Sequence, residues 1–121
     1  MRYSSQRELI TEIIKGRKDH PTADMIYDSA RELKPNISLG TVYRNLKLLS
    51  EEKMIITLET EDKKIHYDGD VSRHGHFICE DCGKIIDLFE PMETPSELKK
   101  LGLKVSGEKC IYYGQCGSCQ K

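Results

Sequence analysis

The 121 residues are enough to bury a core without disulfides, in one medium domain or two small ones. With 19 Lys and Arg against 20 Asp and Glu, the net charge of -1 excludes a polycation that binds nucleic acid through bulk charge, so any DNA contact must be local. The sequence has no apolar run that could cross a membrane, and residues 1–7 lack the apolar stretch of a signal peptide, which predicts a cytoplasmic protein.

Three amphipathic helices are predicted in the first half of the chain. Apolar side chains recur at helical spacing in residues 4–16, and Gly16 ends this first helix. Thr22 caps a second helix that Pro35 stops, and Ser38 caps a third. The side chains predicted to face inward are Leu9, Ile10, Ile13, Ile14, Met25, Ile26, Ser29, Ala30, Leu33, Val42, Leu46 and Leu49.

The following segment changes to a period of two, which is typical of strands. Residues 56–61 alternate apolar and polar side chains, residues 62–64 interrupt the pattern, and residues 65–67 resume it. Three helices followed by a hairpin indicate a winged helix-turn-helix, whose third helix would enter a DNA major groove. The side chains that the third helix would turn outward belong to Gly40, Thr41, Tyr43, Arg44, Asn45 and Lys47.

From Val71 onward the composition shifts towards Cys, His and Gly. The pattern predicts two short strands around the first CxxC turn, a short helix within residues 96–103, and strands in residues 104–119 that end in a second CxxC turn. The chain is therefore expected to be an α+β protein with two domains. We expect residues 1–68 to form a winged-helix DNA-binding domain and residues 69–121 a small metal-binding α/β domain.

Four cysteines, Cys79, Cys82, Cys116 and Cys119, form two CxxC pairs. A CxxC turn presents two thiolates to one ion, and two such turns complete the four-thiolate sphere that structural Zn²⁺ prefers. The competing interpretation is a redox dithiol. Cys110 has no partner at ligand spacing and is predicted to be a small core residue.

A second group of ligand-type residues surrounds the first CxxC turn. His74 and His76 are two residues apart, so on a strand both side chains face the same side. With Asp68 and Asp87 they would give a mixed nitrogen and oxygen site that favours Fe²⁺ or Mn²⁺. A pair of surface histidines is the alternative. His20, in the loop before the second helix, is by local reasoning a solvent-facing histidine.

Four segments then identify a family: "HPTADMIY", "SLGTVYRNLKLL", "HGHFICEDCGKIIDL" and "YYGQCGSC". In order and spacing they resemble the ferric uptake regulator family of metal-dependent repressors, and most closely its peroxide-sensing branch. The resemblance covers nearly the whole chain. It implies a homodimer that binds double-stranded operator DNA, a structural Zn²⁺, Fe²⁺ or Mn²⁺ in a regulatory site, a C-terminal dimerisation domain and no enzymatic activity.

The resemblance also implies roles for particular residues. An aspartate at position 87 is associated with iron-dependent peroxide sensing, in which peroxide oxidises a histidine ligand, here His20 or His74, and releases the DNA. The implied regulatory ligands are His20, Asp68, His74, His76 and Asp87. The implied DNA contacts are Tyr43 and Arg44 to bases, Ser38, Thr41, Asn45 and Lys47 to phosphates, and Arg2 to the minor groove.

Two departures from the family pattern bear on these expectations. The chain begins close to Arg2, so part of the customary first helix is missing, which would affect DNA affinity. The histidine that some members carry near residues 107–109 is not found, so their additional metal site is not expected here. Residues 1–57 hold 10 basic and 8 acidic side chains, a net of +2, so dimerisation should be needed for useful DNA affinity.

Several alternatives remain open. Within the family, the closest is an iron- or manganese-uptake regulator that does not sense peroxide, and Cys79, Cys82 or Cys110 could sense it through thiol oxidation instead of histidine. Outside the family, a zinc-ribbon module that binds RNA or protein would need no second metal. A metalloenzyme is least supported, because the chain has no HExxH motif and no evident base near an open zinc position.

Overall fold

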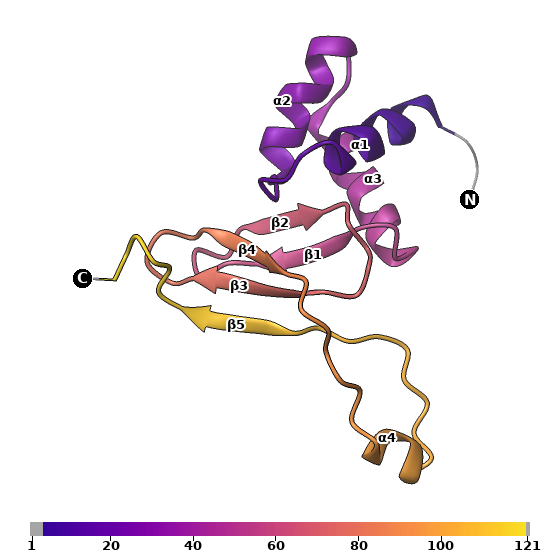
Figure 1. The fold of residues 1–121 in the computed structure, drawn as a ribbon. Helices are drawn as coiled ribbons and strands as arrows, with labels where there is room; N and C mark the ends of the chain where they lie inside the picture. The colour runs from indigo at the N-terminus through magenta and orange to yellow at the C-terminus, as the bar shows by residue number, and fades with distance from the viewer. Residues whose placement is uncertain (1–3, 121) are drawn as a thin grey trace. The chain divides into compact units, whose positions relative to one another are not determined.

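A computed structural model describes residues 4–120, which divide into two compact units between Val71 and Ser72. The N-terminal unit contains three helices and a two-stranded hairpin, and the C-terminal unit contains a three-stranded sheet and one short helix (Figure 1). No helix in this described range is both long and apolar enough to span a membrane.

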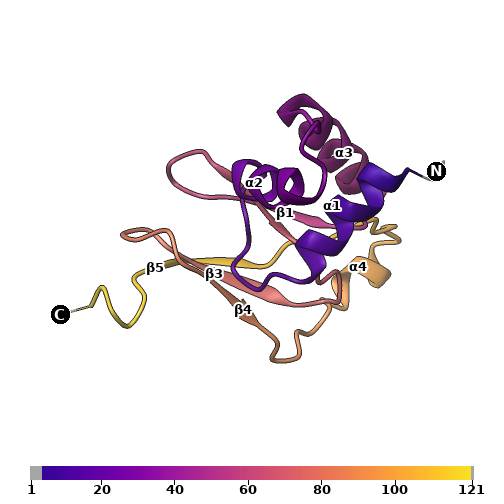
Figure 2. The same cartoon turned by 90° about the horizontal axis from the view of Figure 1, so that it is seen from above.

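The three predicted helices of the N-terminal unit are all present, and Figure 2 shows them from above. They are α1 (Ser5–Lys15), α2 (Ala23–Leu33) and α3 (Leu39–Glu51). Each begins at a side-chain cap: the oxygens of Ser4, Thr22 and Ser38 accept hydrogen bonds from backbone N–H groups in the first turn. The caps predicted at Thr22 and Ser38 are therefore confirmed.

The core of this unit is built from one face of each helix. Ile10 and Ile14 of α1, Ile26 of α2, and Leu46 and Leu49 of α3 are at most 1% exposed. Their spacing of three or four residues places them on one side of each helix, so the predicted periodicity is confirmed. Burial of these aliphatic side chains holds the three helices together.

One predicted core position is wrong. Leu33 was expected to continue the buried face of α2, but its side chain is 71% exposed. Leu33 is the last residue of the helix, and Lys34 and Pro35 then lead the chain away, so no further turn covers it. The buried face of α2 instead consists of Ala23, Ile26 and Ala30.

The predicted hairpin follows α3 as strands β1 (Ile56–Glu59) and β2 (Ile65–Asp68), which pair in antiparallel register. The turn closes when Thr60 N–H donates to the carbonyl of Lys64, and Lys63 has a positive φ of 63° in this turn. Three helices followed by this hairpin make the N-terminal unit a winged helix-turn-helix.

The C-terminal unit is a sheet in the order β4-β3-β5. The central strand β3 (Gly75–Cys79) pairs antiparallel with β4 (Ile85–Leu88) and parallel with β5 (Ile111–Gly114). A parallel pair needs a long connection, and residues 80–110 join β3 to β5 through β4 and the short helix α4 (Glu97–Lys100). Within this unit, α4 stands away from the sheet (Figure 1).

The predicted strands of residues 104–119 are only partly correct. A single strand, β5, forms there, and Val105 lies outside it with its side chain 55% exposed. Residues 104–110 therefore form no strand, although they were included in the prediction.

A pair of leucine substitutions tests this description of the N-terminal core. Leu46→Ala should lower the free energy of unfolding by about 3 kcal/mol, because Leu46 is 1% exposed and truncation leaves a cavity. Leu33→Ala, at a 71% exposed position, should change it by less than about 0.5 kcal/mol. Urea unfolding followed by circular dichroism measures both, and equal effects of the two substitutions would contradict the observed burial.

Candidate metal centres and DNA surface

Parallel pairing of β3 and β5 brings the two CxxC turns together. Cys79 ends β3 and is in register with Gly114, which ends β5. Glu80 N–H donates to the carbonyl of Gly114 at 2.7 Å, so the strands stay paired up to the turns. Both turns therefore leave the sheet at the same end, although they are far apart in sequence.

The four sulfur atoms are spaced for one metal ion. Cys79 Sγ lies 3.7 Å from Cys119 Sγ, and Cys82 Sγ lies 3.8 Å from Cys116 Sγ. All four sulfurs lie within 4.8 Å of one another. Sulfurs bound at about 2.3 Å to a tetrahedral zinc ion are about 3.8 Å apart, whereas a disulfide brings them to about 2.05 Å. This arrangement fits a closed four-thiolate zinc site.

Backbone N–H groups prepare one of these thiols as a ligand. Cys79 Sγ accepts hydrogen bonds from the N–H of Cys116 at 3.4 Å and of Cys82 at 3.5 Å. These donors, that of Cys116 first, lower the pKa of Cys79 to about 6. These hydrogen bonds therefore favour the thiolate form of Cys79, which is the form that binds zinc.

The glycines of the two turns differ in their roles. Gly83, after the first pair, has a φ of +77°, which favours glycine. Gly117, within the second pair, has no positive φ, and a Cβ added there would contact nothing within 4 Å, so its conformation and surroundings do not require a glycine. Cys110 lies outside the group of four sulfurs and is only half-buried.

The N-terminal unit holds two of the predicted regulatory ligands close together. His20 Nε2 lies 3.5 Å from Asp68 Oδ2, and the other oxygen of Asp68 accepts the N–H of Asp70 at 2.9 Å. His20 thus faces a carboxylate of its own unit and is only 5% exposed, so the expectation of a solvent-facing loop histidine is wrong. The aspartate is oriented by the turn that follows β2.

His66, which sequence reasoning left without a role, anchors the loop that carries His20. His66 Nδ1 lies 2.7 Å from the carbonyl oxygen of His20. Since a carbonyl can only accept, this nitrogen carries the proton. Tyr67 N–H donates to the carbonyl of Pro21, and Thr22 pairs with His66 in an isolated antiparallel β-bridge. The loop is therefore attached to the edge of β2, a contact between residues 46 positions apart that local sequence patterns do not reveal.

The backbone at His20 is unusual. Its φ is 51°, a left-handed conformation that non-glycine residues seldom adopt, and it precedes a proline. Such conformations cost about 1–3 kcal/mol and cluster at functional sites. The contacts from His66 and Tyr67 hold the loop in this conformation, which supports a functional role for His20.

The C-terminal unit assembles the other three predicted regulatory ligands. His76 of β3 is in direct register with Asp87 of β4. The Nε2 atoms of His74 and His76 both lie 3.2 Å from Asp87 Oδ1, and the two imidazole rings are 4.5 Å apart. The prediction that both histidines face the same side is confirmed.

Hydrogen bonding also selects the ligand nitrogen of His74. Its Nδ1 lies 2.7 Å from the carbonyl oxygen of Ser72, so Nδ1 is the donor and Nε2 carries the lone pair in the neutral ring. Metal-binding histidines commonly use one nitrogen this way. Ligand atoms about 2.1 Å from an ion lie about 3.0–3.5 Å apart, which is the range found within each unit.

The described DNA candidates lie at the start of α3 and along its outer side. Ser38, Tyr43, Arg44 and Lys47 are exposed, whereas Thr41 and Asn45 are half-buried, not fully outward as predicted. Asn45 Nδ2 donates to the carbonyl of Thr41, and Arg44 donates to the Thr41 hydroxyl. Arg2 lies outside the described residues.

A matched pair of cysteine substitutions tests the zinc site. Cys116→Ser removes one of four ligands, so the purified protein should lose its zinc and the C-terminal unit should unfold at a lower temperature. Cys110→Ser should retain about one equivalent of zinc. Metal analysis and differential scanning calorimetry measure both variants, and a Cys116→Ser protein with full zinc content would contradict the four-thiolate assignment.

Comparisons with known proteins agree with this fold. Residues 1–112 match the family model described as the ferric uptake regulator family. The peroxide operon regulator of Bacillus subtilis is 37% identical over 124 residues, an alignment that covers 100% of this chain and 86% of that protein.

Two solved structures are also similar. The ferric uptake regulator Fur of Helicobacter pylori gives a TM-score of 0.78 at 29% identity, covering 100% of this chain and 83% of that one. The Campylobacter jejuni peroxide stress regulator gives 0.77 at 29% identity, covering 94% and 88%. The matched sequence, the winged helix and the two CxxC turns lead to one conclusion: this chain belongs to the ferric uptake regulator family.

Proposed function

We propose that this protein is a metal-dependent transcriptional repressor that binds operator DNA as a homodimer and releases it when peroxide oxidises a ligand histidine. The observation that carries the proposal is the division of the ligands. His20 and Asp68 are oriented in the N-terminal unit, and His74, His76 and Asp87 in the C-terminal unit. Relatives named as peroxide regulators support the peroxide signal.

Two metals fit the residues present. Cys79, Cys82, Cys116 and Cys119 would hold a structural Zn²⁺ with no open position, which leaves no place for catalysis at that site. The three imidazoles and two carboxylates of the regulatory set suit Fe²⁺ or Mn²⁺. When bound, ferrous iron supplies the electrons that reduce peroxide to an oxidant able to attack a neighbouring imidazole.

The divided ligand set explains how metal could control DNA binding. The five side chains can complete one coordination sphere only in a restricted orientation of the two units. Without metal, that orientation is a fraction of the ensemble, and the apparent DNA affinity falls by the same fraction. The flexible connection between the units begins after Gly69. Gly69 packs closely on α1, because a Cβ added to it would lie only 2.9 Å from the Cα of Lys15.

In this proposal residues 1–68 bind DNA and residues 69–121 form the dimer. Tyr43 and Arg44 are exposed on α3, where an arginine can read a guanine edge and a tyrosine ring can meet a thymine methyl. Exposed apolar side chains on the C-terminal unit offer a surface for a second copy: Phe89, Leu101, Leu103, Val105 and Tyr112. Because the DNA-binding half carries little net charge, two copies are needed for useful affinity.

Oxidation of His20 or His74 would remove one nitrogen donor from the regulatory set. The zinc thiolates then serve as scaffold, because four bound thiolates are shielded from peroxide. The same ligand set would serve an iron-uptake regulator, and the Helicobacter pylori relative is a ferric uptake regulator. Only the response to peroxide separates the two candidate functions. A repressor works where the DNA is, so the proposal includes a cytoplasmic location.

His20→Ala tests the proposal through DNA binding. Duplexes selected from a random library by the Mn²⁺-loaded wild type provide the probe. Mn²⁺ should increase the affinity of the wild type for this duplex about 5–150-fold, and should have no effect on His20→Ala, which lacks one ligand of the shared site. Fluorescence anisotropy titrations measure both proteins, and a variant that keeps the full Mn²⁺ effect would contradict the role of His20.

Peptide mass spectrometry tests the peroxide step. After treatment with Fe²⁺ and peroxide, the wild type should lose DNA affinity and gain the mass of one oxygen atom on the peptide containing His20 or His74. Mn²⁺ in place of Fe²⁺ should prevent both changes. Cys110→Ser is the control and should respond as the wild type does. Release of DNA with oxidation confined to cysteine would instead favour a thiol sensor.

A further inference from the structure

A long segment leaves the sheet of the C-terminal unit between β4 and β5. We call residues 93–107, which include α4, the arm. Nearly every residue of the arm is exposed, with Leu101 at 67%, Leu103 at 55% and Val105 at 55%. Packing within this unit therefore does little to orient the arm, and its orientation must depend on its two ends.

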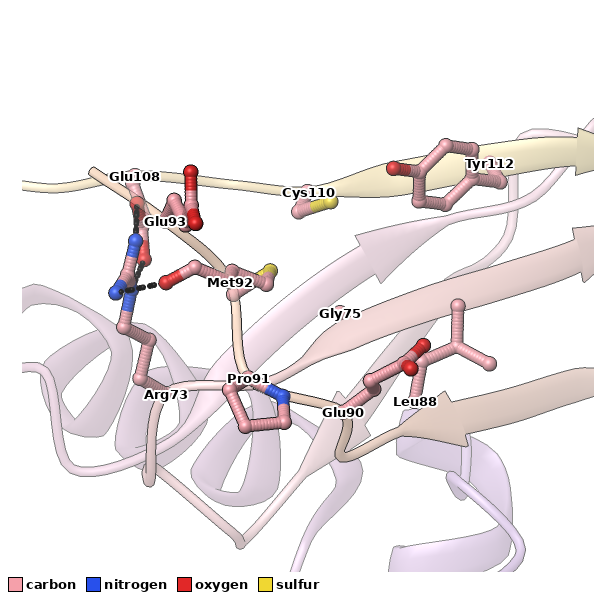
Figure 3. Close-up of a pocket in the computed structure, with 10 residues that line it drawn as sticks. All are labelled: Arg73, Gly75, Leu88, Glu90, Pro91, Met92, Glu93, Glu108, Cys110 and Tyr112. Carbon is pink, nitrogen blue, oxygen red and sulfur yellow. Dashed lines mark hydrogen bonds and ion pairs between the residues drawn. The ribbon is translucent and has the colours of Figure 1, made fainter. Parts of the chain in front are cut away.

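One side chain binds both ends. Arg73 lies two residues before β3. Its Nε and Nη2 both donate to the carboxylate of Glu108, Nη2 at 3.2 Å, and its Nη1 donates to the carbonyl of Met92 at 2.7 Å (Figure 3). The guanidinium is planar, so these three bonds fix both chain segments relative to β3. The hydrogen bond from the same guanidinium lowers the pKa of Glu108.

The contact between Arg73 and Glu108 lies beside a hollow in the C-terminal unit. The ends of the arm border a hollow of about 410 Å³ whose floor is Gly75, a residue without a side chain (Figure 3). Arg73 reaches from the strand to both ends at the margin of this hollow. Because of this hollow, the side chains around the two ends of the arm do not pack tightly on one another. The hydrogen bonds of the Arg73 guanidinium hold the two ends together.

We propose that Arg73 and Glu108 form a clamp that positions the arm for contact with a second copy of the chain. The proposal rests on the homodimer proposed above. The clamp restricts the arm before two copies meet. Less conformational entropy is then lost when the dimer forms, so the clamp favours association. It also gives Glu108 a role other than metal binding, since its carboxylate is occupied by Arg73.

The clamp lies beside one of the proposed regulatory ligands in the sequence. Arg73 lies between Ser72, whose carbonyl accepts the Nδ1–H of His74, and His74 itself. Arg73 acts as a positioning residue and is not itself a metal ligand.

Hydrogen exchange of the zinc-loaded, full-length protein tests the clamp directly. Arg73→Ala should increase amide exchange in residues 93–107 about tenfold and leave α1 to α3 unchanged, because an exposed ion pair contributes little to global stability. The double variant Arg73→Glu with Glu108→Arg should recover protection that either single reversal loses. Arg31→Ala, which removes a similarly exposed ion pair with Asp28, should not change exchange in the arm.

Sedimentation velocity then tests the consequence for association. Arg73→Ala should weaken the dimer about tenfold, while Arg31→Ala should not weaken it. Unchanged exchange in residues 93–107 after Arg73→Ala would overturn the clamp. Increased exchange with an unchanged dimer would overturn its role in association. A wild type that stays monomeric would refute the proposed homodimer, and the exchange experiment would still decide whether the clamp exists.

Discussion

The parallel pairing of β3 with β5 is the contact on which the rest of the C-terminal unit depends. It aligns Cys79 with Gly114 and so brings two cysteine turns from distant parts of the sequence to one end of the sheet. A zinc ion held there would fasten the last strand to the central one, since parallel pairing alone is slightly less stable than antiparallel pairing. The other edge of β3 pairs with β4 and places His76 opposite Asp87. One short strand thus carries Cys79 of the zinc site and His76 of the proposed regulatory set.

Contacts with neighbouring groups orient several of the proposed regulatory ligands. Asp68 is held by the N–H of Asp70, His74 by the carbonyl of Ser72, and the loop of His20 by His66. Each set is stabilised by contacts within its own unit, so metal binding need not order individual side chains. The free energy of metal binding is then available to select an orientation of the two units, which is what a metal-dependent switch requires.

Local sequence patterns predicted much of this structure correctly. Helical periodicity, capping residues and CxxC spacing are determined by contacts between near neighbours, and the helices, caps, hairpin and cysteine cluster follow from them. The predicted burial of Leu33 was wrong because helical periodicity does not reveal where a helix projects beyond its neighbours. The contacts of His66 with His20 and of Arg73 with Glu108 join residues 46 and 35 positions apart, and only the folded chain reveals them. Local patterns gave no reason to treat His20 as a metal ligand, and only the family resemblance suggested that role.

The central claim is that one ion takes ligands from both units. Pulsed electron paramagnetic resonance of the Mn²⁺-loaded protein tests it most directly, because the spectrum counts the histidine nitrogens coupled to the metal. We predict coupling to all three candidate imidazoles, His20, His74 and His76, in the wild type, and loss of one coupled nitrogen in His20→Ala with the others retained. Identical spectra for the wild type and His20→Ala would show that the N-terminal unit supplies no histidine to the ion, and would contradict the account.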